Sequence, residues 1–65
     1  MSSDTVEIED VTVKAETELA LLCIIDDKQH WIPKSVVHEE SEVSAEGDTG
    51  TLVLLRWFGE KEGLV

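Results

Sequence analysis

The sequence predicts a mainly β domain, a small antiparallel half-open barrel of four to five strands with a short C-terminal helical turn. Three observations favour this class. Short apolar or alternating segments recur at 6–15, 19–25, 29–32 and 51–55. Turn-forming residues separate them about every ten residues, as in small barrels. Residues 56–62 have the length of a helical turn. The pattern leaves open an SH3-like barrel, an OB-like barrel, or a curled sheet capped by the C-terminal turn.

The first strand is expected to contain a bulge. Apolar and polar residues alternate at 6–8 and at 11–15, but the parity changes across Glu9 and Asp10. A period-two pattern cannot shift by one residue without turning its apolar side chains to the other face, so a bulge or bend belongs there. The polar residues 1–5 are expected to form a flexible tail, which leaves 6–65 as a single domain.

Two segments, 19–25 and 51–55, carry apolar residues on both faces of an extended chain and are expected to be strands covered on both faces. Periodicity alone leaves a helix open for 19–25. This segment runs into a tight turn at 26–28, and its Cys23 is expected to be a small buried residue. The next strand, 29–32, ends at Pro33, which has no amide proton for a sheet ladder.

The second half of the chain is read in the same way. Residues 36–38 resume pairing briefly, 39–46 form an acidic loop, and 47–50 form a turn. In the terminal turn, Trp57 and Phe58 are expected to close one end of the barrel. Gly63 occupies the position that follows a helix C-cap, with Leu64 packing back onto Phe58.

The charge is the most informative feature for function. Fifteen acidic residues against five basic ones give a net charge of −10, and no Lys or Arg lies between Val36 and Leu55. Such a field repels nucleic acid and anionic membranes and attracts basic protein surfaces. The alternatives are a solvated surface without a partner and an acidic surface that faces a basic partner protein. That surface would comprise Glu39, Glu40, Glu42, Glu46 and Asp48.

Two aromatic and cationic groups are candidate binding sites. Trp31, Lys34 and Ser35 could form a ligand edge, because a base stacks well on an aromatic face and an ammonium binds phosphate. The alternative is a core tryptophan beside an ordinary solvated corner. Arg56, Trp57 and Lys61 form the second group, with Lys34 gathering beside them and opposite the acidic loop. The alternative there is a hydrophobic plug with cations that offset nearby acids.

Metal, cofactor and catalytic sites are not expected. Cys23, His30 and His38 match no zinc spacing, and no nucleophile, base and orienting group can be assigned, so we expect no enzyme. A single cysteine, an acidic N-terminus and apolar runs too short for a bilayer favour a cytoplasmic protein. A domain this small without disulfides or metals is often stabilised by association, so a homo-oligomer is a further expectation.

Two segments resemble a group of small, mostly uncharacterised bacteriophage-type proteins. These combine a WIPKS segment, here Trp31–Ser35, with a terminal tryptophan and a Lys-x-Gly-Leu-like ending, here Trp57 to Leu64. The resemblance covers about the last two-thirds of the chain. It implies a viral or prophage origin and action inside the host cell, and it carries no catalytic residue across.

Three functions follow as hypotheses. The first is inhibition of a host protein, such as a defence component, whose basic surface the acidic chain occupies as a nucleic-acid mimic. The second is an oligomeric module that binds or sequesters a nucleotide-like ligand on Trp31, Lys34 and Ser35. The third is single-stranded nucleic-acid binding by an OB-like barrel, which the net charge of −10 disfavours because phosphate contacts need clustered cations.

Overall fold

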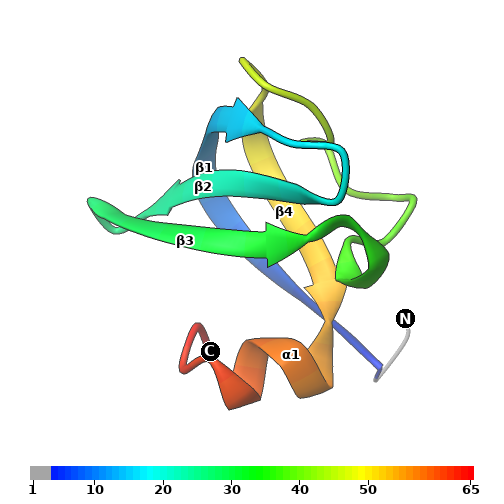
Figure 1. The fold of residues 1–65 in the computed structure, drawn as a ribbon. Coiled ribbons are helices and arrows are strands. Elements are labelled where there is room, and N and C mark those ends of the chain that lie inside the picture. The colour runs from blue at the N-terminus through cyan, green and yellow to red at the C-terminus, as the bar shows by residue number, and fades with distance from the viewer. Residues whose placement is uncertain (1–3) are drawn as a thin grey trace.

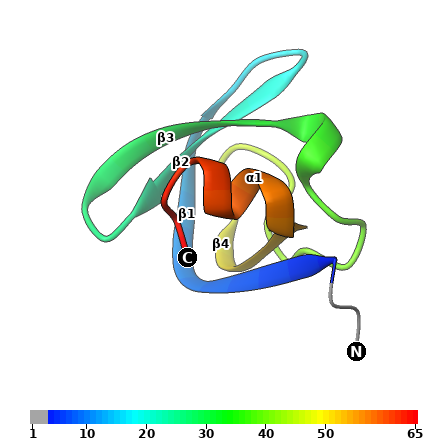
Figure 2. The ribbon, with the colours of Figure 1, turned by 90° about the horizontal axis from the view of Figure 1, so that it is seen from below.

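Four antiparallel strands form one curled sheet, which is the main element of the computed structural model of residues 4–65 (Figure 1). The strands are β1 (Thr5–Glu16), β2 (Ala20–Ile25), β3 (Lys28–Pro33) and β4 (Thr49–Leu55), in the order β3-β2-β1-β4. A 3₁₀ turn (Lys34–Val36) follows β3, and helix α1 (Arg56–Lys61) follows β4. Figure 2 shows α1 across one open end of the curled sheet. The predicted mainly β fold with a C-terminal helical turn is confirmed.

Strand β1 bends at the predicted place, and this lets one strand serve two neighbours. Its pairing with β4 shifts register between Ile8 and Val11, where Asp10 has a left-handed φ of 60°. A second irregularity, at 13–15, was not predicted and interrupts the pairing with β2. The strand already pairs at Thr5, opposite Leu55, so the last residue of the predicted tail belongs to the sheet. Residues 1–3 of that tail lie outside the described residues.

The prediction that both faces of 19–25 are covered is wrong for β2. Leu21, Cys23 and Ile25 are buried, whereas Leu22 and Ile24 point to the opposite side and remain partly exposed. In β4 the same prediction is right, since positions 52, 53 and 54 are all buried. The difference lies in tertiary structure, because residues 38–42 lie along β4, whereas the outer side chains of β2 stay partly exposed.

The core lies inside the curl, and one loop residue completes it. Val43, the single apolar residue of the acidic loop, is fully buried and holds that loop against the barrel. The core cluster comprises Val11, Val13, Leu21, Cys23, Ile25, Ile32, Val36, Val43, Leu52, Leu54 and Phe58. Burial of these side chains is the main favourable term in folding.

The C-terminal helix ends as predicted, but only one of its aromatic residues closes the barrel. Gly63 has φ +72° and donates to the Glu60 carbonyl at 3.2 Å, while Leu64 donates to the Gly59 carbonyl at 2.8 Å. These two bonds define a Schellman cap. Phe58 is buried, whereas Trp57 is 57% exposed and touches Phe58 edge to face. The expectation that both rings plug the barrel is therefore wrong for Trp57.

Candidate functional site

The acidic loop lies along the free edge of β4 and is bonded to it. His38 N donates to the Val53 carbonyl at 2.8 Å, and Glu42 N donates to the Thr51 carbonyl at 2.9 Å. Ser41 Oγ accepts a hydrogen bond from Val53 N at 3.1 Å. The loop thus takes the place of a fifth strand and pairs with main-chain groups of β4, which would otherwise be an open sheet edge.

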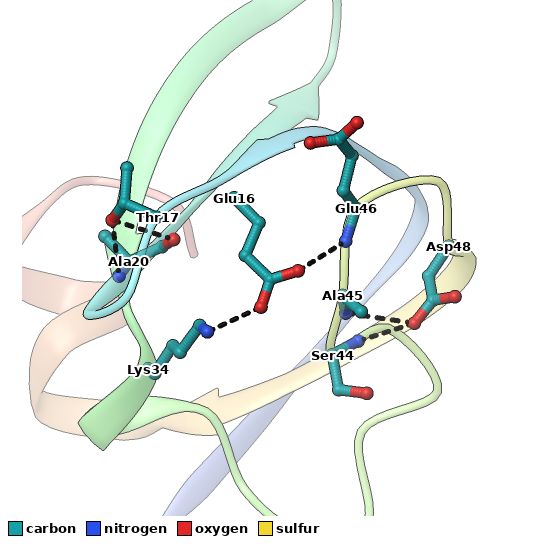
Figure 3. A network of polar contacts seen from close by, with 8 residues as sticks. All are labelled: Glu16, Thr17, Ala20, Lys34, Ser44, Ala45, Glu46 and Asp48. Atoms are coloured by element: carbon teal, nitrogen blue, oxygen red, sulfur yellow. Dashed lines mark hydrogen bonds and ion pairs between the residues drawn. The ribbon is translucent and has the colours of Figure 1, made fainter.

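Two of the predicted acidic residues hold this loop in shape. Glu42 Oε1 accepts from Thr51 N at 2.8 Å. Gly50 beside it has φ +153°, which residues with a side chain rarely adopt, and a Cβ there would lie 2.6 Å from the same oxygen. Asp48 Oδ2 accepts from Ser44 N and Ala45 N, both at 3.0 Å (Figure 3). Glu39, Glu40 and Glu46 have exposed side chains, as the sequence predicts for a partner-facing surface.

Three carboxylates meet over β4 in a shallow groove of about 190 Å³. Glu40 and Glu42 come from the loop and Glu7 comes from β1, and Thr51 and Val53 complete the lining. Glu7 was not singled out in the sequence. Its alternation within 6–8 shows that it points outward, but only the pairing of Glu7 with Val53 brings it to the loop. We call Glu7, Glu40 and Glu42 the acidic triplet.

A larger groove of about 560 Å³ adjoins the acidic triplet. It shares Glu7, Glu40 and Val53 with the first, and it adds the apolar side chains of Val6 and Val65 and the cation of Arg56. Together the two grooves offer an apolar floor with an acidic rim. Such a surface suits a side chain that has an aliphatic stem and a cationic head, as lysine and arginine do.

In the first aromatic and cationic group, Trp31 and Ser35 are exposed, whereas Lys34 is held in an ion pair. Trp31 is 52% exposed and stands on the outer side of β3 opposite Leu22, so the core alternative for this ring is wrong. Ser35 is exposed as well. The ammonium of Lys34, however, lies 2.5 Å from Glu16 Oε2 and forms an ion pair with it (Figure 3).

Glu16 connects three segments of the chain. Besides the ion pair with Lys34, its Oε1 accepts from Glu46 N at 3.1 Å (Figure 3). The hydrogen bond from Lys34, followed by that from the Glu46 amide, lowers the pKa of the Glu16 carboxyl from its ordinary value of 4.5. Lys34 therefore joins the 3₁₀ turn to β1 and lies beside the acidic loop rather than opposite it. The predicted gathering of cations opposite the loop is wrong for Lys34.

The second aromatic and cationic group lies on α1. Arg56 Nη1 is 4.0 Å from Glu60 Oε2, and Lys61 is exposed near the end of the helix. Trp57 lines a groove of about 440 Å³ with Asp4, Leu55, Arg56 and Glu60. Arg56 thus has an acidic neighbour on its own helix turn, as the alternative expected, whereas the hydrophobic plug of that alternative does not include Trp57.

Cys23 lies directly opposite His30 in the β2–β3 pairing, whereas His38 lies beyond the 3₁₀ turn, where it bonds to β4. Cys23 is buried, and burial raises the pKa of its thiol to about 11. His38 Nδ1 accepts a hydrogen bond from Glu40 N at 3.1 Å. Within residues 4–65, no three His, Cys, Asp or Glu side chains are grouped so that they could hold a metal ion. Across the same residues, no helix is long and apolar enough to span a bilayer.

Comparisons with family models, with curated proteins and with solved structures return no match to this chain.

Proposed function

We propose that this chain is a small acidic binding protein that occupies a basic groove of another protein, a groove of the kind that otherwise holds nucleic acid. The observation that carries the proposal is the acidic triplet. Residues from two distant segments place three carboxylates in one groove that no basic side chain lines, beside a larger groove lined by Val6, Val65 and Arg56. The net charge of −10 gives this groove a favourable long-range field toward cations.

The architecture supports recognition by a preformed surface. The loop that carries Glu40 and Glu42 is bonded to β4 at both residues 38 and 42 and is anchored in the core by Val43. A surface held in this way loses little conformational entropy on binding. In a phage-type protein, as the WIPKS segment suggests, such binding would serve to inhibit a host protein, for example a defence component that binds nucleic acid.

The experiment is a capture from nuclease-treated bacterial lysate on the immobilised chain, eluted with rising salt. We expect basic, nucleic-acid-binding proteins to be retained at low salt and released as salt screens the charges. The retained protein, once purified, should lose its bound oligonucleotide when the chain is added. Retention that is insensitive to salt would contradict the proposal, as would a partner that binds the chain and nucleic acid together.

A matched pair of variants separates the groove from the overall charge. The first variant replaces the acidic triplet (E7Q/E40Q/E42Q), and the second replaces three exposed acids elsewhere (E9Q/E18Q/E62Q). Both remove three negative charges. We expect the first to weaken binding at least tenfold more than the second, because close charge pairs at interfaces are worth more than about 1.4 kcal/mol in total. Equal loss in both would show that only net charge matters.

A second candidate function rests on the exposure of Trp31. A half-exposed ring on an outer strand can stack on a nucleotide-like ligand, with the Ser35 hydroxyl nearby in sequence. Calorimetric titration with a panel of nucleotides tests this candidate, with Trp31→Ala and Trp57→Ala as the matched pair. Binding that only Trp31→Ala weakens supports it, and absence of heat with every nucleotide removes it. The engagement of Lys34 by Glu16 leaves the phosphate without its predicted cation, so the acidic groove is the better supported function.

A further inference from the structure

The acidic loop pairs with one edge strand of the sheet, β4, but not with the other, β3. The edge of β4 is covered by the loop at residues 37–42, through the bridge between Val37 and Leu54 and the bonds to Val53 and Thr51. The other edge is β3, and its pairing with β2 runs without a bulge from Lys28 to Pro33. Figure 2 looks toward this edge and shows α1 between β3 and β4. Residues 62–64, which follow α1, line a groove with Lys28 and His30, but Gln29 and Trp31 do not line it.

The hairpin geometry shows which main-chain groups of β3 face outward. Asp26 and Asp27 have φ of 52° and 65°, the values of a two-residue type I′ turn. In such a hairpin the residues that flank the turn, Ile25 and Lys28, are a hydrogen-bonded pair, and every second pair after it is hydrogen-bonded too. Counting every second pair from Ile25–Lys28 leads to Leu19 and Lys34, and Lys34 N indeed donates to the Leu19 carbonyl at 2.8 Å.

It follows that Gln29 and Trp31 direct their N–H and C=O groups away from β2. For residues 4–65, none of the hydrogen bonds formed outside the strand ladders involves the main chain of Gln29 or Trp31. An uncovered and regular edge of this kind is a template for another strand. The side chain of Trp31 stands beside these groups and is half exposed.

We propose that β3 pairs antiparallel with β3 of a second copy of this chain, so that two sheets join into one across a two-fold axis at His30. In this register Gln29 of each copy faces Trp31 of the other, and the two pairs exchange about four main-chain hydrogen bonds. The position of the axis is set by which residues have both a free N–H and a free C=O to exchange. A two-fold axis at Trp31 would place Pro33 opposite Gln29, where the proline has no N–H to donate, and Lys28 opposite Lys34.

Charge identifies a second copy as the occupant. The chain has fifteen acidic residues, yet residues 28–38 contain none. Asp26 and Glu62 line a groove with Lys28 and His30. The segment 28–38 itself offers only neutral and basic side chains, which lessens the repulsion between two highly acidic molecules that meet there. In the proposed register the Asp26–Asp27 turn of one copy lies beside Pro33 and Lys34 of the other, so opposite charges meet at both ends of the joined strands.

The outer side of the joined sheet gains apolar contact as well. Within one copy, Trp31 lies opposite Leu22, and Gln29 lies opposite Ile24. Across the axis each Trp31 ring would have Gln29 of the other copy as its direct neighbour and the second Trp31 on the diagonal, a separation that aromatic side chains can span. The exposure of Trp31 in a single copy is thereby explained.

Sedimentation velocity over a wide dilution series tests the proposal. We expect a species of about twice 7.2 kDa that dissociates on dilution. Trp31→Lys places two ammonium groups near the axis and should abolish the dimer, whereas Trp57→Lys, which changes the other exposed tryptophan, should retain it. A wild-type chain that stays at 7.2 kDa at every concentration would overturn the proposal, as would loss of the dimer in both variants.

Hydrogen exchange gives a second readout that does not depend on a variant. The amides of Gln29 and Trp31 should exchange slowly at high concentration and become at least tenfold faster when the chain is diluted to monomer. The amide of Cys23 in β2 is the internal control and should not change. A dimer whose Gln29 and Trp31 amides exchange at the same rate in both states uses another surface and contradicts the β3 register.

Discussion

Among single residues, the two tryptophans differ from the role that aromatic residues usually have in a small domain. Both are more than half exposed, one at the sheet edge and one on the helix. Single exposed hydrophobic side chains are common on protein surfaces, and Leu19 and Val65 are exposed here too, so exposure alone does not assign a role to either ring. Ile32 and Phe58, the residues that directly follow Trp31 and Trp57, are the ones buried in the core.

Cys23 is expected to be unreactive in the folded chain. Its side chain is fully buried, and burial raises the pKa of the thiol to about 11, so the thiolate that reacts is scarce at neutral pH. Labelling with a thiol reagent at neutral pH should therefore proceed only as fast as the chain unfolds, and urea should accelerate it. Fast stoichiometric labelling of the native chain would contradict the burial of this residue.

Replacement of Asp27 by glycine should stabilise the β2–β3 turn. Asp27 has φ 65°, and a left-handed conformation costs a side-chain-bearing residue about 1–2 kcal/mol, part of which glycine returns as greater freedom when unfolded. We expect a net gain of about 0.5 kcal/mol, measured as a higher urea midpoint. Asp27→Ala is the control and should not stabilise. A lower midpoint for Asp27→Gly would show that the aspartate side chain itself holds the turn.

At the scale of elements, the loop and the 3₁₀ turn depend on one carboxylate. Glu16 lies at the end of β1 and binds Lys34 on one side and the Glu46 amide on the other (Figure 3). The bond to the Glu46 amide fixes the end of the acidic loop, while Val43 fixes its middle. The placement of Glu40 and Glu42 over β4 therefore depends on contacts well outside the acidic triplet.

The contribution of Glu16 should depend on pH with a definite sign. Its pKa is lower in the folded chain than the ordinary value of 4.5, so the stabilisation is present above that value and is lost as the pH falls through the folded value. The urea midpoint of Glu16→Gln should lie below that of the wild type at neutral pH and approach it in acid. Glu18→Gln, in the neighbouring exposed turn, is the control and should follow the wild type throughout. A constant gap between Glu16→Gln and the wild type would contradict the ionic origin.

At the scale of the whole molecule, the two edge strands of the sheet differ in what covers them and in charge. The β4 edge is closed by the acidic loop and carries the acidic triplet, whereas the β3 edge is open and free of acids. The acidic triplet comes from β1 and the loop, so a dimer formed through β3 does not use these carboxylates in its strand pairing. Two grooves on one assembly would increase retention on a dense basic surface through avidity.

The barrel should depend on Phe58 for its stability as a whole. A domain of 65 residues has about 3–10 kcal/mol of total stability, and loss of a buried phenylalanine side chain costs about 3–5 kcal/mol. Phe58→Ala should therefore unfold a large part of the molecules at 37 °C in thermal melts followed by circular dichroism. Trp57→Ala, which changes the adjacent exposed ring, should shift the melting temperature little. A stable Phe58→Ala chain would show that α1 is not needed to close the barrel.

Local features of this fold could be predicted from the sequence. The bulge near Asp10, the end of β3 at Pro33 and the cap at Gly63 each depend on a residue and its immediate neighbours. The burial of Cys23 was expected because this residue lies inside an apolar run, where a free cysteine usually packs as a small hydrophobic side chain.

The sequence by itself determined the strands, the turns and a strongly acidic surface, because backbone preferences and apolar periodicity act over a few residues. Tertiary structure alone decided that the outer face of β2 stays open, that Lys34 is held by Glu16, and that Glu7 joins Glu40 and Glu42. Each of these depends on which strands become neighbours. Strand order arises from pairing between distant segments, and no short-range pattern encodes it.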